Sequence, residues 1–251
     1  MSSIYESTTL VEQYLLFHYG EPDEVMPYPF GPGEALNFPV KIVARYVTTG
    51  PMPADSRALD LGCAVGRSSF ELSKYFGAVI GIDKSSAFIA AAESVRRDGG
   101  IDYKRLDEAP NFTRLRAHRP NGSVPGRIKF ETGDALELRS GLGKFDFVLA
   151  ANLIDRVPDP ASLLKNFAAL VAPGGRLVLT SPYTWLEDFT PSKNWLSNYG
   201  AERTESLAAI RVMLNPDFEF QYCEDLPFLI REHARKFQWS AAQVSVWKRA
   251  D

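Results

Sequence analysis

The stretch ALDLGCAVGRSS, residues 58–69, constrains the fold more than any other part of the chain. An apolar run ends in a short turn with glycines at Gly62 and Gly66, and a helix-forming segment follows. Gly62 lets the chain turn sharply after a strand, and Gly66 lets the helix begin close to a ligand, because a side chain at either place would block the backbone's approach. This order predicts a parallel α/β sheet with a nucleotide-like ligand at the turn.

Apolar runs alternate with amphipathic stretches beyond this turn, which indicates a parallel sheet with crossover helices. We predict an α/β fold of the Rossmann-like, doubly wound type, with a mostly parallel seven-stranded sheet and helices on both faces. The predicted strands are Arg57 to Leu61, Ala78 to Ile82, Ile128 to Thr132, Phe145 to Ala150, Gly175 to Thr180, and two closing strands, Glu219 to Cys223 and Gln243 to Arg249. The predicted helices are Ser68 to Tyr75, Ser86 to Arg97 and Ala161 to Val171.

The first 50 residues differ from this core. Apolar groups within Thr8 to Tyr19 fall on one face of a helix, and a segment dense in proline, glycine and aromatic residues follows as a loop. A further helix over Phe38 to Tyr46 leads towards the core. We expect residues 1–50 to form a helical, aromatic lid that binds substrate, and residues 51–251 to form the main ligand-binding domain.

Residues 98–127 interrupt the alternation with a connection that is longer than usual between a helix and a strand. The segment is locally basic, with Lys104, Arg105, Arg114, Arg116 and Arg119. A solvated surface insertion and a flap over a substrate or partner both fit this pattern.

The composition narrows the class of partner. A formal charge of −3 and a pI near 5.7 provide no overall field that would gather polyanions, so we expect neither nucleic acid nor a membrane as partner. Cys63 and Cys223 form neither a metal-spaced pair nor a disulfide framework, so we expect no metal and a reducing compartment. The N-terminus lacks the order of a signal peptide, and no apolar run approaches a membrane span, which favours a cytoplasmic protein.

The spacing at the turn and the acidic residues nearby indicate the ligand. The pattern is G-x-x-x-G, and a dinucleotide site usually needs a further glycine for its phosphates. Asp60 would repel a pyrophosphate and attract an ammonium group, as at the amino-acid end of S-adenosylmethionine. Asp83, at the tip of the next strand, suits the two hydroxyls of a ribose, and Asp134, after the third strand, can reach an adenine amino group.

These residues resemble the class I S-adenosylmethionine-dependent methyltransferases. LDLGCAVG is similar to their first motif, GIDKS to the second-strand acid, GDA to the adenine-side motif, and FDFVLAANLIDRV to the fourth strand and its loop. The resemblance implies S-adenosylmethionine as cofactor and S-adenosylhomocysteine as its product. It implies cofactor contacts from Asp60, Gly62, Cys63, Gly66, Asp83, Lys84, Ser85, Asp134, Ala135 and Asn152. Ala64 stands where the family usually has glycine, and we expect binding to survive if that position needs no positive φ angle.

The flanks carry a narrower resemblance. YESTTLVEQYLLFHYGE, PFGPGEALNFPVKIVARY and SPYTWLEDFTPSKNWL resemble the 4-mercaptohistidine N1-methyltransferase family of ovothiol biosynthesis. The resemblance implies methylation of a ring nitrogen of 5-thiohistidine, the same compound under another numbering, to give ovothiol A. That family's domain is often fused to an iron-dependent sulfoxide synthase. This chain has no such domain, so we expect a separate sulfoxide synthase and lyase to supply the substrate.

A thiolated imidazole with an amino-acid tail needs aromatic walls, hydrogen-bond donors and one cation. Tyr14, Phe38 and Trp185 are candidate walls, Asn37 is a candidate for the imidazole edge, and Arg45 is a candidate for a carboxylate of the substrate or of the cofactor. We expect His18, Tyr19 and Tyr183 to act catalytically by fixing which ring nitrogen faces the methyl group. Because methyl transfer from a sulfonium depends mostly on alignment, no strong base is required.

Three alternatives stay open. One is a class I methyltransferase of another small acceptor. Another is a nicotinamide-dependent oxidoreductase, which the glycine spacing and Asp60 disfavour. The third is a non-catalytic cofactor-binding relative, for which Ala64 is the sign.

Overall fold

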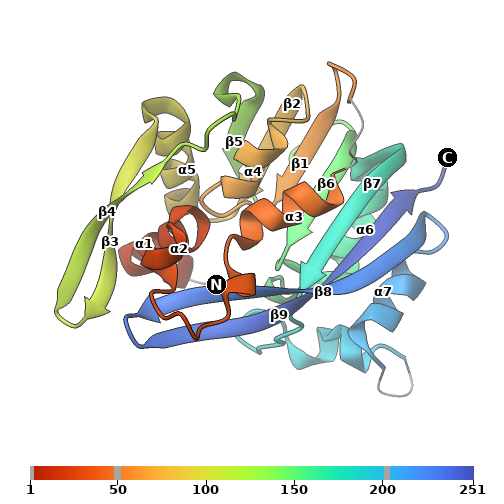
Figure 1. Ribbon diagram of the computed structural model, residues 1–251. Coiled ribbons are helices and arrows are strands. Elements are labelled where there is room, and N and C mark those ends of the chain that lie inside the picture. Colours follow the sequence, from red (N-terminus) through yellow and green to blue (C-terminus); the bar gives the residue numbers. More distant parts are fainter. Residues whose placement is uncertain (1–2, 48–51, 201–203) are drawn as a thin grey trace.

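The computed structural model describes residues 3–47, 52–200 and 204–251, and it contains a seven-stranded sheet in the order β5-β2-β1-β6-β7-β9-β8 (Figure 1). The pairs within β5, β2, β1, β6 and β7 are parallel, and β9 pairs antiparallel with both β7 and β8. The bounds of these strands are Arg57–Leu61 (β1), Ala78–Asp83 (β2), Ile128–Thr132 (β5), Phe145–Ala151 (β6), Val171–Ser181 (β7), Phe218–His233 (β8) and Lys236–Arg249 (β9). The predicted mostly parallel α/β fold is confirmed.

Helices cover both faces of the sheet, as predicted. Their bounds are Thr8–Tyr19 (α1), Pro22–Val25 (α2), Phe38–Tyr46 (α3), Arg67–Leu72 (α4), Ser86–Asp98 (α5), Pro160–Leu170 (α6) and Ser206–Leu214 (α7). Side chains of α1, α3, α4 and α5 share one hydrophobic cluster with the sheet, and those of α6 and α7 share the other. Strand β6 is apolar along its length because both of its faces are covered. Leu149 packs in the cluster with α1, α3, α4 and α5, Val148 packs in the cluster with α6 and α7, and both are fully buried.

The N-terminal helices pack directly on the sheet. Ser7 caps α1 by accepting a hydrogen bond from the Leu10 N–H at 3.3 Å, and Leu15 and Leu16 are buried beneath it. Helix α3 buries Tyr46, whose hydroxyl donates to Glu224 at 2.7 Å. The predicted domain boundary between residues 50 and 51 lies outside the described residues, so the division into two domains stays a prediction.

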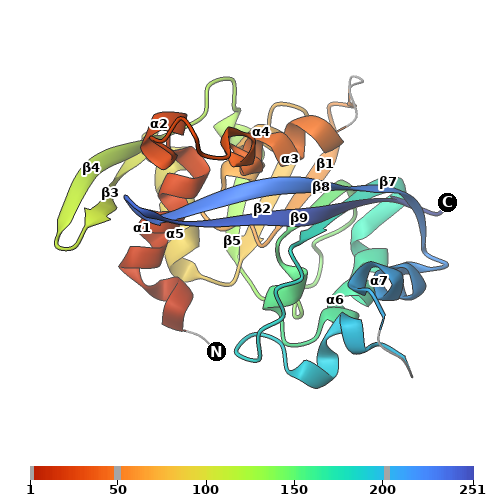
Figure 2. The ribbon, with the colours of Figure 1, turned by 60° about the horizontal axis from the view of Figure 1, so that its bottom comes forward.

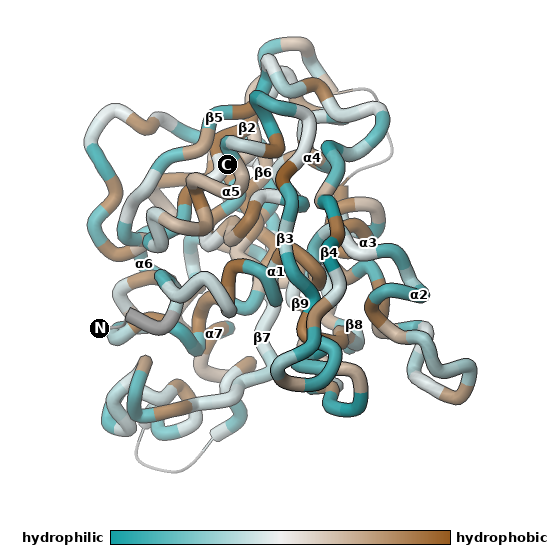
Figure 3. The backbone as a smooth tube through the Cα atoms, turned by 90° about the vertical axis from the view of Figure 1, so that its left-hand side faces the viewer, coloured by the Kyte–Doolittle hydropathy of each residue, from teal (hydrophilic) through white to brown (hydrophobic). Residues whose placement is uncertain are grey.

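Residues 98–127 form a β-hairpin of their own, which the sequence analysis did not predict. Strands Gly100–Glu108 (β3) and Asn111–His118 (β4) pair antiparallel, and the short helix Pro125–Arg127 (η3) follows. Figure 3 shows mostly hydrophilic residues along this hairpin. Its charges are partly paired within it, as in Arg116 with Asp102 at 2.7 Å. The alternation of charged and apolar residues at period two was the sequence signal for these strands.

The closing strands are much longer than predicted. Strands β8 and β9 run from the sheet's edge to the side of α1 and the β3–β4 hairpin (Figure 2). Strand β8 continues through Pro227 because β8 is an edge strand, where a missing N–H costs little. Helix α7 was also missed. Within the described residues, no helix is both long enough and apolar enough to cross a membrane.

Arg231 ties three of these elements together. Its side chain is only 3% exposed and donates to the Glu24 carbonyl of α2 at 2.8 Å and to the Asp107 carboxylate of β3 at 3.2 Å. Replacing Arg231→Met is therefore expected to lower the free energy of unfolding by about 2 kcal/mol. Urea denaturation measures this, with exposed Arg235→Met as the matched control, expected to change it by less than about 0.5 kcal/mol. Equal effects of the two variants would contradict the role given to Arg231.

Candidate active site

The turn after β1 is tied to the end of β2. Gly62 and Gly66 adopt left-handed backbone with φ of +77° and +88°, as their glycine identity predicts. The N–H of Gly62 donates to the Ile82 carbonyl at 2.7 Å. The Asp83 carboxylate accepts the Ala64 N–H at 2.9 Å. Ala64 has φ of +47°, so the expectation that this position needs no positive φ was wrong, and the left-handed backbone costs about 1 to 2 kcal/mol.

A cavity of about 1030 Å³ opens at the carboxyl ends of the parallel strands. It is roomy for one drug-sized ligand, whose sites usually span about 300 to 1000 Å³. The predicted residues that line it are Tyr14, His18, Phe38, Asp60, Gly62, Cys63, Asp83, Lys84, Ser85, Asp134, Ala135 and Asn152. The structure therefore gathers most of the predicted cofactor residues, with three of the predicted acceptor residues, around one space.

The carboxyl group of Asp60 is the most perturbed acid of the cavity. Its side chain lies in β1, is 2% exposed and accepts a hydrogen bond from the Ser69 hydroxyl at 2.6 Å. Burial raises the pKa of Asp60 to about 7, and the neighbouring Asp83 carboxylate adds to this. A carboxyl group that ionises so reluctantly gains from any cation placed beside it.

The other two strand-end acids have protein partners already. Asp83 accepts the Ala64 N–H through Oδ2 and the Ser85 N–H through Oδ1, each at 2.9 Å, and burial raises its pKa. Asp134 accepts the Lys84 ammonium at 2.6 Å and the Leu136 N–H at 2.9 Å. Each carboxylate oxygen has two lone-pair sites, so both acids keep accepting capacity towards the cavity.

His18 reaches the cavity from the last turn of α1. Burial, with a smaller effect of the Arg67 guanidinium, lowers the pKa of His18 to about 3. Its Nδ1 is buried and has no hydrogen-bond partner among the described residues. The imidazole is therefore neutral near pH 7 and is a weak base, so it offers hydrogen bonds to a ligand more readily than it removes a proton.

Six predicted site residues do not line the cavity: Tyr19, Asn37, Arg45, Gly66, Tyr183 and Trp185. The Tyr19 hydroxyl is buried against the Val65 carbonyl at 2.7 Å. Gly66 caps α4, where a Cβ would meet the Phe130 ring at 2.6 Å. Asn37 caps α3 in left-handed backbone. These three residues therefore shape the backbone rather than the ligand's surroundings.

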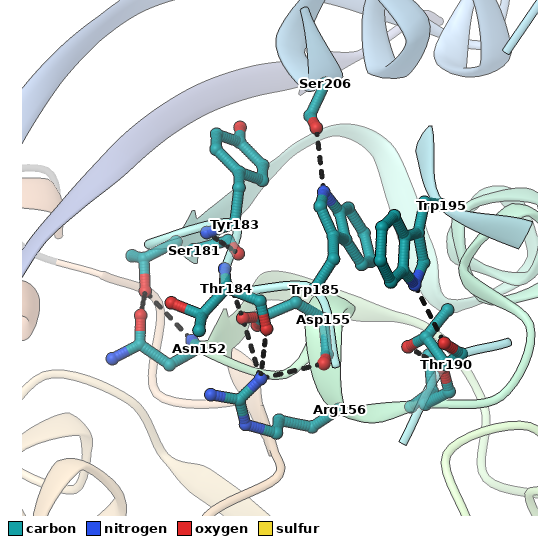
Figure 4. Close-up of polar contacts among 12 residues, drawn as sticks. Asn152, Asp155, Arg156, Ser181, Tyr183, Thr184, Trp185, Thr190, Trp195 and Ser206 are labelled. Atoms are coloured by element: carbon teal, nitrogen blue, oxygen red, sulfur yellow. Dashed lines mark hydrogen bonds and ion pairs between the residues drawn. The ribbon is translucent and has the colours of Figure 1, made fainter. Parts of the chain in front are cut away.

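The remaining three are turned to other partners. Arg45 is 53% exposed and pairs with Glu224 at 3.4 Å, so it does not reach a carboxylate in the cavity. The Tyr183 hydroxyl donates to the Gln243 carboxamide at 3.1 Å. The Trp185 indole N–H donates to the Ser206 hydroxyl at 3.2 Å, as Figure 4 shows. A sequence identifies such side chains but does not give the direction in which they point.

Sequence reasoning missed several cavity residues. The most informative is Arg156, in the short helix Ile154–Arg156 (η4) after β6, inside the already quoted stretch FDFVLAANLIDRV. Other missed lining residues lie in the N-terminal segment, helix α5, the loop after β7 and the β8–β9 hairpin. They include Tyr5, Gln13, Phe88, Phe189, Phe228, Phe237, Gln238 and Trp239. The aromatic residues of the β8–β9 hairpin were the available signal for Phe228, Phe237 and Trp239.

Comparison with known proteins identifies the family to which the chain is related. A family model described as "Methyltransferase domain" matches residues 35–221. The "Ubiquinone biosynthesis O-methyltransferase" of Coxiella burnetii is 25% identical over 153 residues, and that of Xanthomonas euvesicatoria is 28% identical over 176 residues. These matches cover 61% and 69% of this chain but 55% and 59% of the relatives. The chain thus spans little more than half the length of the curated relatives that it matches.

A solved structure agrees with the fold. The N-methyltransferase NodS from Bradyrhizobium japonicum, in complex with S-adenosyl-L-homocysteine, aligns with a TM-score of 0.54 and 15% sequence identity. The alignment covers 98% of this chain and 100% of that chain. At this identity the likeness concerns the fold alone, because unrelated functions share such folds.

Ala64→Gly is expected to stabilise the protein. The relief of left-handed strain at Ala64 exceeds the extra backbone entropy that glycine loses, which leaves a gain of about 0.5 to 1 kcal/mol in the free energy of unfolding. Urea denaturation tests this. The control is Ala91→Gly within helix α5, which is expected to cost about 1 kcal/mol. A loss at both positions would show that the turn does not strain Ala64.

Asp60→Asn is expected to stabilise the ligand-free protein in a pH-dependent manner. The pKa of Asp60 is about 7 in the folded state against 3.8 in the unfolded chain, so its contribution to stability is lost as the pH rises through 7. The advantage of the variant should therefore increase by about 2 to 3 kcal/mol between pH 5 and pH 8, most of it below pH 7. Denaturation at both pH values measures it. Exposed Asp98→Asn should show no such growth, because the Arg97 guanidinium lowers the pKa of Asp98.

Proposed function

The chain belongs to the methyltransferase domain family, and on that premise we propose that it transfers a methyl group from S-adenosylmethionine to a ring nitrogen of 5-thiohistidine. The product would be ovothiol A. The observation that carries the proposal is the cavity itself, in which acidic strand ends adjoin a space walled by aromatic side chains. The resemblance of the flanks to the ovothiol family supports the choice of acceptor.

The strand-end acids fit S-adenosylmethionine. Asp60 suits an ammonium group, because a cation beside it would offset the cost of its burial. Asp83 would take the ribose hydroxyls, and Asp134 with Ala135 would border the adenine. When bound, this cofactor supplies an electrophilic methyl group on a sulfonium. The sulfur leaves as a neutral thioether, so its departure needs no acid.

The chain's aromatic side chains would hold the acceptor ring. Tyr14 lies 4.8 Å from Phe88 between ring centroids, and Phe17 lies 6.3 Å from Phe38 in a stacked arrangement. Such walls bind a planar heterocycle through burial and stacking, and they exclude water from the transfer. Fixing the ring in one orientation contributes most of the catalysis that alignment can provide.

His18 would select the reacting nitrogen. The neutral imidazole of His18 has one ring nitrogen that can accept a hydrogen bond from an N–H of the acceptor ring, and the opposite nitrogen of that ring would then keep its lone pair. A histidine with a pKa near 3 is a weak base, which fits an acceptor nitrogen that is already nucleophilic. A phenol acceptor would need a stronger base, and this favours the imidazole over an acceptor of that class. The thiolate of the acceptor must be held away from the methyl group by the same walls.

The decisive experiment incubates the purified protein with S-adenosylmethionine and 5-thiohistidine, with histidine and a catechol as control acceptors. Mass spectrometry detects methylated product, and NMR locates the methyl group. We expect a ring N-methyl product, formed at least about tenfold faster from 5-thiohistidine than from histidine. The neighbouring thiolate raises the electron density, and with it the nucleophilicity, of the ring nitrogen. Methyl transfer to the catechol alone, or to sulfur, would overturn the choice of acceptor. Cofactor binding without any product would favour a non-catalytic relative.

A further inference from the structure

We propose that Arg156 binds the carboxylate of the methyl acceptor and thereby selects acceptors of the amino-acid class. The inference rests on the proposed function in one respect, namely that the cavity holds an acceptor beside the cofactor. Arg156 takes the carboxylate-binding role that was predicted for Arg45, because Arg45 is exposed and paired with Glu224 outside the cavity.

The guanidinium group of Arg156 is held in place mainly through Nη1. Its Nη1 makes three contacts at 2.9 Å, to the Asp155 carbonyl, the Asp155 carboxylate and the Thr184 carbonyl (Figure 4). Asp155 is fully buried, and its carboxylate also accepts the Thr184 N–H at 3.0 Å. The carbon of the guanidinium lies 5.1 Å from the centroid of the Phe189 ring. These contacts fix the plane of the group before any ligand arrives.

The rest of the guanidinium is available to a ligand. Figure 4 shows Nη2 on the side away from the Asp155 carboxylate. The three hydrogen bonds that Arg156 donates to Asp155 and Thr184 all use Nη1, and the Arg156 side chain is only 26% exposed and lines the cavity. Burial raises the pKa of the nearby Tyr5 phenol, and the Arg156 guanidinium opposes that rise. Two parallel N–H groups beside a neutral phenol form a donor set that matches a carboxylate.

The position of Arg156 in the sheet favours the acceptor over the cofactor. Arg156 follows β6, and its partner Thr184 follows β7. The acids suited to ribose and adenine end β2 and follow β5, and these strands lie on the other side of β1. The other Lys or Arg in the described lining is Lys84, which is 63% exposed and paired with Asp134. Arg156 is therefore the cation best placed for an anionic acceptor.

A role limited to neutralising Asp155 is the competing explanation. It accounts for the bonds of Nη1 but not for the place of Arg156 in the lining of the cavity. Burial raises the pKa of Asp155 and the Arg156 guanidinium opposes this, so loss of Arg156 alone leaves a poorly solvated carboxyl group. The double variant Asp155→Asn/Arg156→Gln removes both charges together. Arg156→Lys keeps the charge but loses the paired N–H groups.

The test is calorimetric titration in the presence of S-adenosylhomocysteine with two ligands, 5-thiohistidine and its decarboxylated counterpart 5-thiohistamine. The wild-type protein is expected to bind the carboxylate ligand about 10- to 100-fold more tightly. The double variant should bind both ligands equally, and Arg156→Lys should retain part of the preference. The matched control is Arg97→Gln, an exposed arginine paired with Asp98, which should retain all of it. The affinity for S-adenosylhomocysteine alone should stay unchanged in every variant.

Three results would overturn the inference. The wild type binding both ligands equally, or neither, would remove the carboxylate site. A double variant that keeps the preference would assign it to another residue. If the Arg156 variants bind S-adenosylhomocysteine more weakly but keep the preference for the carboxylate ligand, Arg156 contacts the cofactor and not the acceptor. The readout is binding, so a protein that prefers the carboxylate ligand but forms no product separates a failure of the proposed reaction from a failure of this inference.

Discussion

The hydrogen bond from the Ala64 N–H to the Asp83 carboxylate is the interaction on which the rest of the site depends. Together with the bond from Gly62 to the Ile82 carbonyl, it fixes the turn after β1 against the end of β2. Parallel strands bring their carboxyl ends to one edge, so this link sets where the acids of three strands meet. The left-handed backbone at Ala64 is strained, and the Asp83 bond holds it there.

The cavity is stabilised by its surroundings rather than by its own groups. Asp60 is buried with the Ser69 hydroxyl as its polar neighbour, and His18 is kept neutral with an unpaired Nδ1. Each arrangement costs free energy in the protein alone and is repaid only by a ligand of matching chemistry. Such unfavourable groups, gathered at one edge of the sheet, are typical of functional sites.

The opposite ends of the chain contribute aromatic side chains to the wall of this cavity. Helix α1 supplies Tyr14 and His18, and the β8–β9 hairpin supplies Phe228 and Trp239. The hairpin reaches them because β8 continues past Pro227 along the free edge of the sheet. Strand length therefore has a functional consequence, since a hairpin of the predicted length would end before the aromatic wall.

The sequence by itself determined the sheet, the glycine turn and the acids at the strand ends, because these follow from local periodicity and from backbone angles that glycine favours. It also identified the two helices Thr8–Tyr19 and Phe38–Tyr46 in the N-terminal segment. Only the tertiary structure decided which side chains face the cavity. Arg45, Tyr183 and Trp185 turn to other partners, while Arg156 turns inward. The reason is that a side chain's direction depends on contacts made by residues far away in the chain, such as Glu224 with Arg45, and local sequence patterns carry no record of those contacts.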